Sequence, residues 1–100
     1  MLAESIGTPA MLEQTAEECA ELAQACLKLA RLIRGENAVH KSLTDILDNL
    51  HEEIADVEIC IGELKQSRTV CEGALSKWNA IKVKRIETRL AENGGKAHEQ

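Results

Sequence analysis

Most apolar residues of the chain fall into two long runs that repeat every three or four positions. The first run comprises Leu12, Ala16, Cys19, Ala23, Cys26, Ala30 and Ile33. The second comprises Leu43, Leu47, Leu50, Ile54, Val57, Ile61 and Leu64. This spacing brings each set to one face of an α-helix. We therefore predict helices over residues 9–34 and 43–66, with the two stripes facing a shared core.

Local signals mark the ends of these two helices. Thr8 can cap the first helix, and Pro9 suits a first helical position because its missing N–H would be unpaired there. Gly35 is a good stop after the first helix. Ser42, with Asp45 three positions later, resembles a capping box at the start of the second.

A third helix is predicted over about residues 70–92, closed by Gly94 and Gly95, with residues 1–8 as a loose or short lead-in. The expected fold is therefore all-α: an antiparallel bundle of about three long helices in one domain spanning 1–100, with an ordered core of about 9–92. Further apolar residues exceed what three helices can hide, so we expect a homodimer or homotetramer. They are Leu22, Leu29, Ile33, Ile46 and Ile59.

Composition agrees with close-packed helices, because 44% of the residues are hydrophobic but only 1% are aromatic. One proline and no alternating β-branched run leave strands without support. The net charge of −5 argues against a nucleic-acid partner. No apolar run is long enough for a membrane span, and no secretory signal opens the chain, so we expect no membrane partner and a cytoplasmic location.

The four cysteines lack the spacing of a redox or zinc motif. Cys19 and Cys26 lie on the first apolar stripe, where a free thiol behaves as a small hydrophobic group, so we predict that both are buried. A disulfide framework is not expected in a chain with this helical pattern.

Two acidic pairs interrupt the two helical runs at a spacing of three residues: Glu18 with Glu21, and Glu53 with Asp56. Each pair shares a helix face next to the apolar stripe, so packing of the two helices would bring four carboxylates together. Positions 25, 57 and 60, four residues after three of these acids, hold no lysine or arginine that could pair with them. A divalent metal, Mg²⁺ or Mn²⁺, is the simplest source of the positive charge that such a cluster needs. The alternative interpretation is that the acids form solvated faces and bind no metal.

The motifs EECAE and EIAD, with their order and the surrounding EECAELAQA and LHEEIADVEI, resemble those of the MazG-like all-α nucleotide pyrophosphohydrolases. The resemblance covers roughly residues 10–90. It implies an Mg²⁺-dependent hydrolase, with Mn²⁺ as the alternative ion, that cleaves a nucleoside or deoxynucleoside triphosphate to the monophosphate and pyrophosphate. Such an enzyme would serve as a housekeeping activity on the nucleotide pool.

Carried over residue by residue, the resemblance assigns the metal to Glu18, Glu21, Glu53 and Asp56. It assigns Glu17 to the orientation or activation of the attacking water, with a second metal as the other reading. It also implies a basic stretch near the triphosphate. The matching residues of the third predicted helix are Asn79, Lys82, Arg85 and Arg89. The alternative is that this stretch is a solvated face paired with Glu87 or Glu92.

A non-enzymatic helical module for oligomerisation or interaction is the competing hypothesis, because two unbroken stripes with heptad-like spacing also suit coiled-coil pairing. A di-iron carboxylate bundle is disfavoured, since that design uses two Glu-x-x-His motifs and the chain has none.

Overall fold

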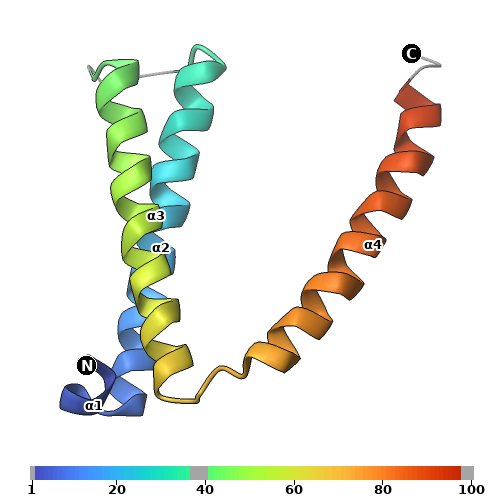
Figure 1. Ribbon diagram of the computed structural model, residues 1–100. Helices are drawn as coiled ribbons and strands as arrows, with labels where there is room; N and C mark the ends of the chain where they lie inside the picture. The colour runs from blue at the N-terminus through green and yellow to red at the C-terminus, as the bar shows by residue number, and fades with distance from the viewer. Residues whose placement is uncertain (1, 37–40, 98–100) are drawn as a thin grey trace. The chain divides into compact units, whose positions relative to one another are not determined.

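The computed structural model describes residues 2–36 and 41–97, with side chains described as far as residue 94. These residues form four helices and no strand, which confirms the all-α prediction (Figure 1). The helices are α1 (Leu2–Ile6), α2 (Thr8–Ile33), α3 (Leu43–Gln66) and α4 (Glu72–Ala97). The chain divides into two compact units, Met1–Thr69 and Val70–Gln100, which are described separately below.

The first unit is an antiparallel hairpin of α2 and α3, with α1 packed at the end where α2 begins and α3 finishes (Figure 1). Ala3 of α1 is buried, and its backbone N–H donates a 3.2 Å hydrogen bond to Oε2 of Glu63 on α3. A carboxylate at this position satisfies one of the unpaired N–H groups of the first turn of α1. The contact fixes a five-residue helix that is too short to be stable alone.

The ends of α2 and α3 agree in part with the predicted signals. The side chain of Ser42 accepts a hydrogen bond from the N–H of Asp45 at 3.2 Å, as predicted. Gly35 follows α2 with φ of 77°, in the left-handed conformation that favours glycine. The prediction for Thr8 is wrong, because Thr8 is the first helical residue and Gly7, with φ of 85°, takes the capping position without a side-chain bond.

Two segments differ from the sequence-based expectation. The lead-in of residues 1–8 contains α1, which lacks a signal of its own and depends on its packing against the hairpin. The last helix does not stop at Gly94 and Gly95 but runs from Glu72 to Ala97. Glycine inside a helix costs about 1 kcal/mol relative to alanine, which weakens a helix without ending it.

The buried row of α2 is displaced by one position from the predicted stripe. Its buried and half-buried residues are Met11, Thr15, Glu18, Leu22, Ala25, Leu29 and Leu32. The predicted stripe is wrong as a core for six of its seven residues: Ala30 is half-buried, but Leu12, Ala16, Cys19, Ala23, Cys26 and Ile33 are exposed. The burial predicted for Cys19 and Cys26 is therefore wrong as well. The predicted stripe contains only apolar residues, whereas the row that packs on α3 contains Glu18.

On α3 the predicted stripe is partly right. Leu64 is buried, and Leu47, Leu50 and Val57 are half-buried. Leu43, Ile54 and Ile61 are exposed, while the buried row runs through Ile46, Leu50, Glu53, Val57, Cys60 and Leu64. Like its counterpart on α2, this row carries an acidic residue at its centre.

The displaced apolar residues form a surface of their own. On both helices they lie roughly a fifth to a third of a turn beyond the buried row, in the same rotational sense. In an antiparallel pair this brings both sets to the same side of the hairpin. We call this surface the apolar side of the hairpin; it comprises Leu12, Cys19, Ala23, Cys26, Leu43, Ile54 and Ile61.

The second unit consists of α4, which has no buried residue among those whose side chains are described. Trp78 is 50% exposed and Leu90 is 64% exposed, so apolar surface on α4 has no partner within its own unit. Across the described residues, no helix is both long enough and apolar enough to span a membrane.

Candidate metal centre

The two acidic pairs meet halfway along the α2–α3 hairpin. Glu18, Glu21, Glu53 and Asp56 each offer one carboxylate oxygen, and these atoms all lie within 4.8 Å of one another. Glu18, Glu53 and Asp56 are half-buried and Glu21 is exposed. The structure therefore brings together the four acids that the sequence singled out, on facing helices and open to solvent on the Glu21 side.

Two of the carboxylate oxygens are enclosed without a hydrogen-bond partner. Oε2 of Glu18 and Oε2 of Glu53 have no bonding partner in the described part of the chain. No ion pair among the described residues involves any of the four acids. Enclosed polar atoms in proteins are nearly always bonded, so these two call for a proton or a cation.

The surroundings of Glu18 disfavour its charged form. Burial is the main reason that the pKa of Glu18 is raised above its ordinary value, and the charges of Glu21 and Asp56 raise it further. A hydrogen bond from Nε2 of Gln14 to Oε1 of Glu18, at 2.8 Å, acts in the opposite direction. A nearby positive charge would therefore stabilise the charged form of Glu18.

Cys60 lies on the same buried row of α3, one helical turn beyond Asp56, and is 5% exposed. Burial raises the pKa of its thiol, and the negative charges of Glu18 and Asp56 add to that rise, while a hydrogen bond with the side chain of Thr15 opposes it. The thiol is therefore a neutral neighbour of the acidic cluster at physiological pH.

The cluster has the donors that a hard divalent cation prefers. Mg²⁺ binds oxygen at about 2.0–2.1 Å, so two ligands on opposite sides of the ion lie roughly 4.2 Å apart. The observed spread of 4.8 Å needs only a small closure of the side chains. An all-carboxylate set favours Mg²⁺ or Mn²⁺ over the softer metals, which prefer thiolate or imidazole.

The remaining predicted site residues lie outside this cluster. Glu17 is exposed, next to Glu18 on α2. Asn79, Lys82, Arg85 and Arg89 are all exposed on α4, in the second unit. Their assignment to water activation and phosphate binding stays a prediction.

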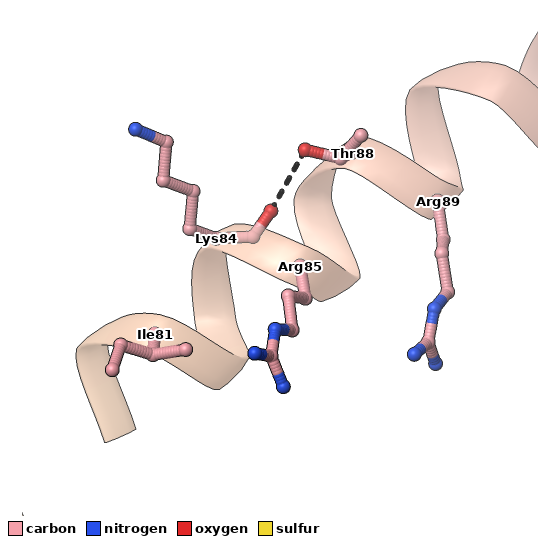
Figure 2. A pocket seen from close by; sticks show the side chains of 5 residues that line it. All are labelled: Ile81, Lys84, Arg85, Thr88 and Arg89. Carbon is pink, nitrogen blue, oxygen red and sulfur yellow. Dashed lines mark hydrogen bonds between the residues drawn. The ribbon is translucent and has the colours of Figure 1, made fainter. Parts of the chain in front are cut away.

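Helix α4 carries a hollow along one side, lined by Ile81, Lys84, Arg85, Thr88 and Arg89. Figure 2 shows the guanidinium groups of Arg85 and Arg89 extending from the same side of the helix, with Lys84 extending from another. The hydroxyl of Thr88 donates to the backbone carbonyl of Lys84 at 3.0 Å. Two neighbouring guanidinium groups of this kind suit an anionic oxygen group.

Gln14, Lys84 and Thr88 also lie at these places and are not among the residues that the sequence motifs indicate. A signal existed for Gln14, because a glutamine four residues before a glutamate can bond to it along a helix. Lys84 and Thr88 gave no signal, since they fall between the basic positions chosen for their regular spacing.

The chain matches no model of a known protein family, no curated protein and no solved structure. The resemblance to the MazG-like enzymes therefore depends on the two acidic motifs and their setting. The support for a function comes from the arrangement of the four carboxylates on α2 and α3.

Proposed function

We propose that the protein is a metal-dependent nucleotide pyrophosphohydrolase, with Mg²⁺ as its ion and Mn²⁺ as the alternative. Its substrate is a nucleoside or deoxynucleoside triphosphate, and its products are the monophosphate and pyrophosphate. The observation that supports this most strongly is the approach of four carboxylates to within 4.8 Å, two of them with enclosed oxygens that have no hydrogen-bond partner among the described residues. Such an arrangement is costly for the metal-free protein and suits one that binds a cation.

In this proposal Glu18, Glu21, Glu53 and Asp56 would hold the ion, which would supply positive charge for the phosphate oxygens and for activation of water. Water attacks the α-phosphorus, the bond to the bridging oxygen of the β-phosphate breaks, and pyrophosphate leaves. Glu17 orients this water or accepts its proton. The resemblance to the MazG-like enzymes assigns the binding of phosphate oxygens to the side-chain amide of Asn79 and the cations of Lys82, Arg85 and Arg89 on α4.

The test is release of pyrophosphate from a panel of ribo- and deoxyribonucleoside triphosphates, with Mg²⁺ and then with Mn²⁺. We expect turnover of at least one nucleotide. Glu53→Gln should lower the rate by more than about 100-fold, because even the outer partners of metal ligands are typically worth about 10–100-fold. Its helical circular-dichroism signal should stay unchanged.

Glu52→Gln is the matched control, since Glu52 is the adjacent residue, is exposed and lies outside the cluster. It should keep nearly full activity. Full activity of Glu53→Gln would contradict the assignment of the site, and absence of turnover with either ion would contradict the enzymatic proposal.

A non-enzymatic interaction module is the second candidate, and the apolar side of the hairpin is the observation that favours it. The two candidates differ in their response to metal. A metal site predicts that millimolar Mg²⁺ or Mn²⁺ raises the free energy of unfolding by about 1–3 kcal/mol, as expected for a ligand present well above its dissociation constant. An interaction module predicts no change.

The proposal includes a homodimer or homotetramer. The apolar side of the hairpin and the exposed apolar residues of α4, with Val83 53% and Ile86 51% exposed, support association.

A further inference from the structure

Among the described residues, the side chain of Gln14 makes one hydrogen bond, and its partner belongs to the acidic cluster. It lies one helical turn before Glu18 on α2 and is half-buried. Its Nε2 donates a hydrogen bond to Oε1 of Glu18 at 2.8 Å. This is close to the ideal length for a bond between an amide donor and a carboxylate. Gln14 directs its amide nitrogen, a hydrogen-bond donor, at Glu18 and so acts on the cluster through that residue.

Because of this bond, the two carboxylate oxygens of Glu18 have different surroundings. Oε1 is engaged by the amide, while Oε2 is enclosed and has no hydrogen-bond partner in the described part of the chain. The other acids of the cluster repel Glu18 and favour rotation of its side chain toward solvent. A donor fixed on the preceding turn opposes that rotation.

We propose that Gln14 is a positioning residue of the metal centre, which holds Glu18 so that its free oxygen, Oε2, faces the cation. The inference depends on the proposed function for the identity of the site, and it adds a residue that touches neither the ion nor the substrate. Hydrogen bonds to the outer atoms of a ligand fix its orientation, and removing them weakens metal binding.

A purely structural role for the same bond makes a different prediction. A glutamine–acid pair four residues apart slightly stabilises an isolated helix and would leave metal affinity unchanged. Metal affinity therefore separates the two roles, whereas thermal stability does not.

The experiment is a titration of the purified full-length protein with Mn²⁺, in which free Mn²⁺ is measured by electron paramagnetic resonance. Gln14→Met keeps the length and helix propensity of the side chain but removes the donor. We expect its dissociation constant for Mn²⁺ to rise about tenfold, the lower end of the range for such partners. Gln24→Met, at an exposed position of the same helix, should bind as the wild type does.

A double-mutant cycle shows whether Gln14 acts through Glu18. In the Glu18→Ala background the orientation of the carboxylate no longer matters, so adding Gln14→Met should change the remaining Mn²⁺ affinity by less than about twofold. A further tenfold loss in that background would overturn the proposal. So would a Gln14→Met single variant that binds Mn²⁺ like the wild type.

The metal-free protein gives a second measurement. The side-chain amide resonance of Gln14, identified by its loss in Gln14→Met, should shift in Glu18→Ala; an unshifted resonance would overturn the proposal. Wild-type protein that binds no Mn²⁺ would overturn both this role and the proposed function. Wild-type protein that binds Mn²⁺ with the expected loss in Gln14→Met, but cleaves no nucleotide, would support the role of Gln14 and contradict the hydrolase proposal.

Discussion

Glu18 occupies a position where the packing of the hairpin favours an apolar side chain. It stands in the buried row of α2 between Thr15 and Leu22, and Glu53 holds the equivalent place on α3. An apolar residue would fill either position without the cost of enclosing a carboxylate oxygen. Residues that lower stability tend to occur at functional sites. Here Glu18 and Glu53 place a carboxylate at matching packed positions of two facing helices.

The thiol of Cys60 reports on this environment. Alkylating reagents attack the thiolate, so burial and the raised pKa of Cys60 should both slow its reaction. At pH 8 we expect the exposed Cys71, which lies outside the apolar side of the hairpin, to react at least about ten times faster than Cys60. Mass spectrometry of peptides after timed iodoacetamide treatment measures each rate. Equal rates in the native protein would contradict the buried position, and guanidinium should abolish the difference.

At the scale of helices, α2 and α3 end with the same hydrogen-bond pattern but different residues. After α2, the N–H of Gly35 bonds to the carbonyl of Leu32 at 3.1 Å, and that of Glu36 to Arg31 at 2.9 Å. After α3, the matching bonds from Arg68 and Thr69 are both 3.0 Å long. Glycine takes the left-handed position in the first case, whereas Arg68 takes it with φ of 63° in the second. A side chain in that conformation is strained.

Exchanging the residue type at these two positions should therefore have opposite effects. Arg68→Gly should raise the free energy of unfolding by a net amount of about 0.5–1 kcal/mol. Relief of the backbone strain is larger than this, but the entropy that glycine adds to the unfolded chain offsets part of it. Gly35→Ala should lower it by about 1 kcal/mol, and this cost is conformational because, apart from the two chain neighbours, no described residue has an atom within 4 Å of the added methyl group. Urea unfolding followed by circular dichroism measures both. Destabilisation by Arg68→Gly would show that the Arg68 side chain contributes more than the strain costs.

Sequence patterns predicted the two long helices of the hairpin to within a residue or two, because capping residues and turn glycine act locally. They also predicted which four acids meet, since the three-residue spacing fixes each pair on its helix and the antiparallel pairing does the rest. They did not predict α1, which depends on the contact of Ala3 with Glu63. Nor did they predict the buried row of α2, because neighbouring rows compete and the choice depends on the shape of α3.

At the scale of the molecule, the apolar side of the hairpin is the reason to expect association between copies of the chain. Leu12 is 46% exposed and Leu43 is 52% exposed, and both belong to the apolar side of the hairpin. Few of the residues whose side chains are described are fully buried, and the largest of these is Met11. A thin core beside exposed apolar residues that share one side of a helical hairpin is typical of a protomer that completes its packing with another copy.

Sedimentation equilibrium should therefore give a mass of two or four times the 11.0 kDa of the chain. Ala23→Arg introduces a long charged side chain at the centre of the apolar side, while leaving the buried row of α2 untouched, and should shift the mass toward that of the monomer. Gln24→Arg adds the same charge at the next position, which helical geometry turns away from this surface, and should associate as the wild type does. A wild-type mass of 11.0 kDa would contradict association, and equal masses for both variants would show that copies meet through a different surface.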